Sequence, residues 1–278
     1  MEGFYSLCTK NSSKASSYRM RDYEFLTMAL SVCEWQKHNG DAYMYADQVA
    51  KDYLESTRIA DIFRGGVRPL KVPDNINTNM FWAAGKIFAL RQIDRPMAMI
   101  DLDLIIWKSL DKSFEGKDVF VIHREELSES TYPDVSRLSM KKDYVFDKSW
   151  DMSVKPCNTA LLYIADDAFR QYYCDEAIRF MSMASDTDDR LWHMVFAEQR
   201  LLPILASLKG KQVDSYFGLA SDIGKQDVFT HVWGHKSILR YNYNEKVKYC
   251  DRIMGRLERD YPQVYQLCRM IYKEKCSD

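Results

Sequence analysis

The sequence lacks several features that would assign its 278 residues to a special class of protein. No apolar run approaches the ~20 residues that cross a bilayer, so we expect no transmembrane segment. Residues 1–10 show no basic segment followed by an apolar one, so we expect no signal peptide. The seven cysteines are scattered and include no C-x-x-C pair, which argues against a disulfide framework or a zinc site. We therefore expect a reduced, cytoplasmic protein.

An excess of charge of one sign is also missing. The chain has 39 Lys and Arg against 40 Asp and Glu, which gives a net charge of −1. Proteins that bind nucleic acid usually carry a basic excess, so we expect no nucleic-acid partner. Hydrophobic residues make up 46% and charged residues 28% of the chain, the balance of a globular protein rather than a disordered one.

Short apolar runs alternate with longer amphipathic segments. The apolar runs predict strands at 3–9, 42–46, 97–100, 119–122 and 160–164. The other segments predict helices at 18–38, 47–64, 75–92, 167–182, 187–208 and 244–275, the last interrupted near residues 261–262. This alternation predicts an α/β fold with a mostly parallel central sheet and C-terminal helices. The stretch 125–151 is polar and irregular, which predicts a loop that closes over a ligand.

Asp101 and Asp103 come directly after the apolar run 97–100, which is typical of a strand buried on both faces. In open α/β sheets, ligands bind outside the carboxyl ends of the strands. On an extended chain, carboxylates at i and i+2 point the same way, ~6.5–7 Å apart. Oxygen ligands of this kind favour Mn²⁺ or Mg²⁺. The sequence therefore predicts a metal site here, and two solvated aspartates at a strand end are the simpler alternative.

The segment 99–106 (Met-Ile-Asp-Leu-Asp-Leu-Ile-Ile) resembles the D-x-D segment of GT-A fold glycosyltransferases, which use nucleotide-sugar donors. Other segments follow in the order that this family shows. Residues 43–47 resemble its second strand, and residues 158–162 resemble its N-x-G strand, with Ala160 in place of the Gly. Glu198-Gln199 resembles a later Asp-Gln pair. Residues 231–236 resemble the H-x-x-G-x-x-K segment of retaining members related to glycogenin and galactosyltransferases, with the Lys one position early.

The resemblance implies a GT-A-like catalytic domain over residues 1–240 and a C-terminal helical extension over residues 241–278. The nucleotide-binding half would extend over about residues 1–110 and the acceptor half over about residues 111–240. The implied activity is a metal-dependent hexosyltransferase. It would move a sugar from a nucleotide diphosphate donor, UDP rather than GDP, to a hydroxyl acceptor such as a glycan. The family includes retaining and inverting enzymes, so the stereochemistry stays open.

The resemblance also implies roles for particular residues. His231 would complete a metal site with Asp101 and Asp103, and Mn²⁺ (or Mg²⁺) is the implied cofactor. Lys236 would neutralise the departing diphosphate. The implied donor-binding residues are Thr9, Lys10, Asp47, Lys86, Asp101, Gly234 and Lys236. The implied catalytic residues are Asn158, Glu198 and Gln199, with Glu198 as general base if the enzyme inverts, although a glutamate in this context is usually a surface residue.

Two other functions compete with this one. A haloacid-dehalogenase-type phosphatase would use Asp101 as nucleophile and Asp103 as general acid, but its motif usually lies near the N-terminus, and here about a hundred residues precede it. A non-catalytic sugar- or nucleotide-binding protein of the same fold would explain the departures at Ala160 and after Lys236. The basic and aromatic residues of 241–252 predict a helix that contacts a membrane surface or a partner or, more simply, a solvated helix face.

Overall fold

The structure is a computed structural model that describes residues 1–10 and 18–275. A seven-stranded sheet runs through its centre, with the strand order β3-β2-β1-β4-β7-β6-β8. Its strands are β1 (Gly3–Leu7), β2 (Ala42–Ala46), β3 (Gly66–Pro69), β4 (Ala98–Ile100), β6 (Val119–Arg124), β7 (Cys157–Ile164) and β8 (Val213–Leu219). A second sheet pairs only β5 (Leu104–Ile106) with β9 (Phe229–His231).

Parallel pairs dominate the central sheet. Strands β1 and β2, β2 and β3, β1 and β4, and β6 and β8 pair in parallel. Strand β7 is antiparallel to both of its neighbours, β4 and β6. The prediction of an α/β fold with a mostly parallel sheet and C-terminal helices is therefore confirmed.

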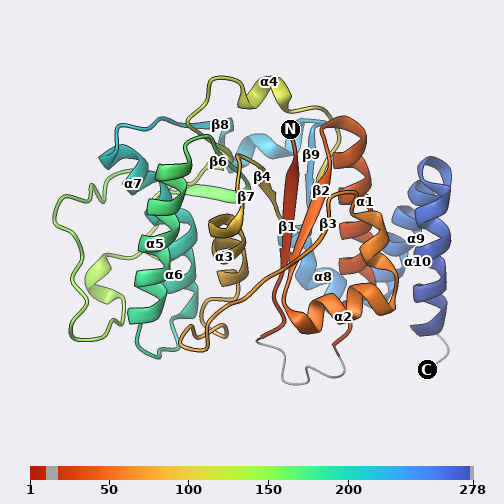
Figure 1. Ribbon diagram of the computed structural model, residues 1–278, viewed down its shortest axis with the longest axis horizontal. Coiled ribbons are helices and arrows are strands. Elements are labelled where there is room, and N and C mark those ends of the chain that lie inside the picture. The colour runs from red at the N-terminus through yellow and green to blue at the C-terminus, as the bar shows by residue number, and fades with distance from the viewer. Residues whose placement is uncertain (11–17, 276–278) are drawn as a thin grey trace.

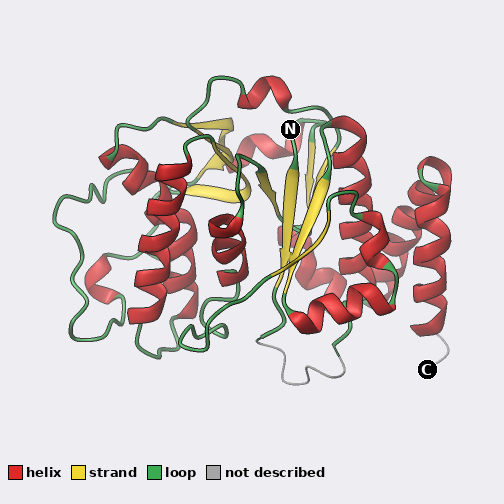
Figure 2. Ribbon diagram, in the orientation of Figure 1, coloured by secondary structure: helices red, strands yellow, loops and turns green. Residues whose placement is uncertain are grey.

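Helices cover both faces of the sheet (Figure 1, Figure 2). They are α1 (Asp22–His38), α2 (Gln48–Ser56), α3 (Ala84–Gln92), α4 (Asp111–Phe114), α5 (Asp167–Met183), α6 (Arg190–Val195), α7 (Leu201–Leu208), α8 (Lys236–Tyr241), α9 (Tyr243–Asp260) and α10 (Pro262–Lys275). Successive strand residues point to opposite faces, so Phe4 and Met99 enter one core while Tyr5 and Ile100 enter the other. The sheet thus separates two hydrophobic cores. One lies between the sheet and α1, and the other lies between the sheet and helices α3 and α5.

Three of the predicted helices differ substantially from the structure, and the others differ by four residues or fewer at their ends. The helix predicted at 47–64 ends at Ser56, because Arg58 adopts a left-handed conformation with φ of 60°. The helix predicted at 75–92 begins at Ala84, since the Asn77 side chain accepts hydrogen bonds from the backbone N–H groups of Asn79 and Met80 and forms a turn instead. The helix predicted at 187–208 is divided by a π-helical turn, Phe196–Arg200.

The C-terminal helices pack against α1. The interruption predicted near residues 261–262 is confirmed, since α9 ends at Asp260 and α10 begins at Pro262. The hydroxyl of Tyr249 in α9 lies 2.7 Å from that of Thr27 in α1. Across the described residues, no helix is both long and apolar enough to span a bilayer.

Candidate functional site

Asp101 and Asp103 lie in a tight turn between β4 and β5, not on an extended chain. The backbone N–H of Leu104 donates to the carbonyl of Asp101 at 3.1 Å and closes the turn. The prediction of two carboxylates on an extended strand end was therefore wrong in geometry. The turn lies at the carboxyl end of β4, where the sheet of an α/β protein exposes its ligand site.

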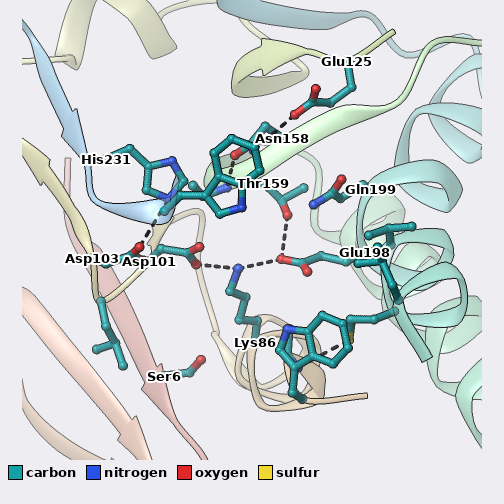
Figure 3. A pocket seen from close by; sticks show the side chains of 18 of the residues that line it. Ser6, Lys86, Asp101, Asp103, Glu125, Asn158, Thr159, Glu198, Gln199 and His231 are labelled. Carbon is teal, nitrogen blue, oxygen red and sulfur yellow. Dashed lines mark hydrogen bonds and ion pairs between the residues drawn. The ribbon is translucent and has the colours of Figure 1, made fainter. Parts of the chain in front are cut away.

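The pairing of β5 with β9 brings His231 to this turn. The two strands are antiparallel, with His231 opposite Leu104. The backbone N–H of Val232 also donates to the carbonyl of Asp103 at 3.1 Å. As a result, Nε2 of His231 lies 3.6 Å from Oδ2 of Asp103 (Figure 3).

The three side chains fit a divalent cation. One ligand atom from each of Asp101, Asp103 and His231 lies within 4.8 Å of the other two. A divalent cation would hold adjacent ligand atoms ~3 Å apart, so these side chains would draw closer together around the ion. Oδ1 of Asp101 and Oδ2 of Asp103 are buried without a hydrogen-bond partner among the described residues. Each of them forms an ion pair with a lysine ammonium group, and Oδ2 of Asp103 also faces the ring of His231.

Two lysines neutralise these carboxylates. Nζ of Lys236 lies 2.8 Å from Oδ2 of Asp103. Nζ of Lys86 lies between two carboxylates, 2.5 Å from Oδ1 of Asp101 and 2.6 Å from Oε1 of Glu198 (Figure 3). The hydroxyl of Thr159 donates to the same Glu198 oxygen at 2.7 Å. The buried carboxylates are therefore held by charge and hydrogen bonds from β7, α3 and the segment after β9.

The surroundings shift the pKa values of three of these groups. Burial raises the pKa of Asp101 to about 6; the nearby Lys86 opposes the shift and Asp103 adds to it. Burial lowers the pKa of His231 to about 4, although Asp103 opposes it. Burial disfavours the charge on Lys86, but the carboxylates of Asp101 and Glu198 outweigh it and raise the Lys86 pKa. At neutral pH, His231 therefore carries the free lone pair with which an imidazole binds a metal.

A cavity of about 630 Å³ opens beside the turn, within the usual size range of small-molecule sites. Its polar lining includes Lys86, Asp101, Asp103, Asn158, Thr159, Glu198, Gln199, His231 and Lys236. Its rim carries the apolar side chains of Trp82, Leu191 and Trp233, which are about half exposed or more. Residues of the segment 125–156 form another wall, with Glu125, Glu126, Ser128, Thr131 and Tyr132 facing the space.

Glu198 and Gln199 reach the cavity from the π-helical turn Phe196–Arg200. Single π turns inside α-helices are frequent at functional sites. Glu198 is only 5% exposed, which rules out the alternative that it is a surface residue; its catalytic role stays a prediction. Its charge is tolerated inside because Lys86 and Thr159 bind it. Asn158, at the start of β7, accepts from the backbone of Ala160 at 3.0 Å.

Four of the residues predicted to bind the donor lie outside the lining of this cavity, as far as the structure describes it. The backbone N–H of Thr9 donates to Asp47 at 2.5 Å, and Asp47 caps α2 by accepting from Ala50 at 2.9 Å. Nζ of Lys10 binds the carbonyl of Val72 at 2.6 Å. Gly234 lies next to the lining residue Trp233. The donor-binding roles of Thr9, Lys10, Asp47 and Gly234 stay predictions.

Sequence reasoning missed Thr159, Tyr132, Trp82 and Trp233. Thr159 follows Asn158 directly, so its place on the same strand was the available signal. Tyr132 lies in an irregular segment, where no periodicity indicates which side chains turn inward. Trp82 lies within the helix predicted at 75–92, but in the structure it precedes α3 and is 47% exposed at the rim of the cavity.

The chain belongs to the DUF6734 family, described as a family of unknown function, whose model matches residues 2–271. No curated protein matches the sequence.

Among solved structures, galactosyltransferase LgtC in complex with donor and acceptor sugar analogues has 10% sequence identity and a TM-score of 0.39, with 71% of this chain and 70% of that chain covered. Glycosyltransferase GlyE of Streptococcus pneumoniae TIGR4 has 12% identity and a TM-score of 0.40, with 78% and 45% covered. Mouse xyloside xylosyltransferase 1 has 6% identity and a TM-score of 0.37, with 77% and 85% covered. Such scores are too low to assign an activity to this chain.

Proposed function

We propose that this protein is a metal-dependent glycosyltransferase that moves a sugar from a nucleotide diphosphate donor, with UDP-sugars favoured, to a hydroxyl acceptor such as a glycan. The observation that carries the proposal is the convergence of Asp101, Asp103 and His231 from two distant segments at the edge of a large polar cavity. The resemblance of the D-x-D and His-containing segments to GT-A glycosyltransferases supports the same function.

Asp101, Asp103 and His231 are the residues that would hold Mn²⁺ or Mg²⁺. When bound, such a cation neutralises a diphosphate and stabilises it as a leaving group. The Lys236 side chain is 46% exposed, so it is free to exchange Asp103 for a diphosphate oxygen. Glycosyl transfer needs little beyond orientation and charge stabilisation, and these residues provide both.

The opposite side of the cavity would orient the sugars. Asn158 and Gln199 present carboxamides, which hydrogen-bond sugar hydroxyls well. Glu198 is held by Lys86 and Thr159, so its position is fixed before a ligand arrives. The segment 125–156 would exclude water from the bound donor, as closing loops do in other enzymes.

The first test is the thermal stability of the purified protein with Mn²⁺ and each of UDP, GDP, CDP and ADP. A ligand at ~100 times its dissociation constant stabilises a fold by ~2.7 kcal/mol. We expect a Mn²⁺-dependent rise in Tm with UDP that is lost in Asp103→Ala. Asp227→Ala removes an exposed aspartate away from the site, 79% exposed, and should keep the rise.

The absence of a shift with every nucleotide would refute donor binding. Release of phosphate from phosphate monoesters by the same protein would then favour the phosphatase, and the absence of both would favour a non-catalytic binding role.

A further inference from the structure

Tyr132 binds the carboxamide of Gln199. Its hydroxyl donates a hydrogen bond of 2.6 Å to Oε1 of Gln199. Burial raises the pKa of Tyr132, and Glu125 adds to the shift, so the phenol stays a donor throughout the physiological pH range. A carboxamide whose oxygen is occupied in this way has its NH₂ group left to donate elsewhere.

The NH₂ group of Gln199 is an unused donor. Within the described part of the chain, no hydrogen bond of its Nε2 is found, and Figure 3 shows the carboxamide pointing into the cavity. The amide of Asn158 on the same side is already directed at Glu125, 3.4 Å away. Glu125, Glu126 and Glu198 line the same side with carboxylates, which only accept. A ligand oxygen entering this side of the cavity therefore meets in Gln199 an uncharged donor that no described residue occupies.

We propose that Tyr132 is a positioning residue: its hydroxyl fixes the Gln199 carboxamide so that the NH₂ group faces the cavity and donates to an oxygen of the bound sugar substrate. The identity of the ligand as a sugar substrate rests on the function proposed above, whereas the orientation of the Gln199 carboxamide does not. Without the phenol, the carboxamide is free to turn over and to present its oxygen, which a sugar ether or phosphate oxygen would repel.

The segment that carries Tyr132 is fastened close to this contact. The indole N–H of Trp192 in α6 donates to the carbonyl of Ser130 at 3.0 Å. The guanidinium of Arg200, which directly follows Gln199, donates to the carbonyl of Met152 at 2.6 Å. The segment is therefore fixed on both sides of Tyr132 to the helical stretch that carries Gln199, and such outer contacts keep a binding group in one orientation.

The test uses Tyr132→Phe, which keeps the ring and removes the hydroxyl. The matched control is Tyr144→Phe, because Tyr144 is a buried tyrosine of the same segment that is not among the described residues lining the cavity. The first readout is the side-chain NH₂ resonance of Gln199 by NMR, assigned from its loss in Gln199→Ala. We expect the resonance to move in Tyr132→Phe and to stay in Tyr144→Phe. A resonance that stays in Tyr132→Phe overturns the proposal.

The second readout is the release of UDP from UDP-glucose and UDP-galactose with Mn²⁺. A lost hydrogen bond of ordinary strength predicts a fall in kcat/KM of about three- to tenfold in Tyr132→Phe. An equal fall in Tyr144→Phe, which would indicate a general structural effect, overturns the proposal. A moved resonance in a protein that neither binds nor turns over any nucleotide supports the positioning role and refutes the proposed glycosyltransferase function.

Discussion

Replacing Lys86 with methionine should destabilise the protein strongly. The ammonium group lies within 2.6 Å of both Asp101 and Glu198, and the three side chains are only 18%, 19% and 7% exposed. Methionine keeps most of the volume but leaves two buried carboxylates facing each other. Removing one partner from a buried ion pair costs about 3–5 kcal/mol, because the remaining charge stays unpaired.

The expected change in Tm follows from the size of the chain. An unfolding entropy of about 2.1 cal/mol/K per residue gives roughly 0.6 kcal/mol/K for this protein. A loss of about 3–5 kcal/mol then lowers Tm by about 5–8 °C. The assay is thermal and urea unfolding in the presence of a chelator, so that no metal replaces the missing ammonium group.

The loss should also depend on pH. Burial raises the folded-state pKa of Asp101 to about 6, so this group favours folding below its unfolded pKa and loses that contribution as pH rises through about 6. Without Lys86 the pKa rises further, since the opposing ammonium group is gone. The variant should therefore be closest to wild type near pH 5 and furthest from it near pH 8.

The control is Lys108→Met. Lys108 lies 2.6 Å from Asp227, but the two side chains are 52% and 79% exposed, and exposed pairs contribute little. A Lys86→Met variant that loses no more stability than this control, and whose loss is the same at pH 5 and pH 8, would refute the stabilising ion pairs of Lys86 with Asp101 and Glu198.

Three further predictions concern the same cavity. Lys236→Ala should tighten the binding of Mn²⁺ alone and weaken the binding of Mn²⁺ with UDP, because the ammonium group beside Asp103 repels a cation and attracts a diphosphate. Calorimetry with and without UDP measures both affinities, and two affinities that change in the same direction would contradict this prediction. Mn²⁺ binding should weaken about tenfold per pH unit below about 6, since Asp101 must first lose its proton. A Mn²⁺ affinity that is the same at pH 7 and pH 5 in an electron paramagnetic resonance titration would contradict this prediction. Arg200→Met should increase hydrogen exchange across residues 125–156 and lower the free energy of unfolding by ~1–3 kcal/mol, because it removes the donor that binds the carbonyl of Met152. Unchanged hydrogen exchange in mass spectrometry would argue against a role of Arg200 in holding this segment.

Much of the fold could be predicted because its signals are local. The buried strand before Asp101 is a continuous apolar run, and the break between α9 and α10 coincides with Pro262. Strands β5 and β9 have three residues each, too few for a pattern, and they become strands only by pairing across the chain. That pairing is also what brings His231 to Asp103, so only the resemblance to a known family pointed to it.

The burial of Lys86 and Glu198 and their ion pair could not be predicted from the sequence. Lys86 and Glu198 are 112 residues apart, and each looks like a solvated residue on its own helix. Each is stable inside the protein only because the other is present, together with Asp101. Tyr132 illustrates the same limit, since an irregular segment gives no periodicity, and its partner Gln199 lies 67 residues away.

The proposed metal site places a divalent cation between Asp101, Asp103 and His231 at the edge of the cavity. Its most direct test is a crystal of the protein grown with MnCl₂ and UDP, with diffraction data collected above and below the manganese absorption edge. We predict one anomalous peak within ~2.0–2.3 Å of an oxygen of each aspartate and of Nε2 of His231, with the diphosphate beside it. A peak at other residues, or UDP bound in the cavity with no peak at these three, would contradict it.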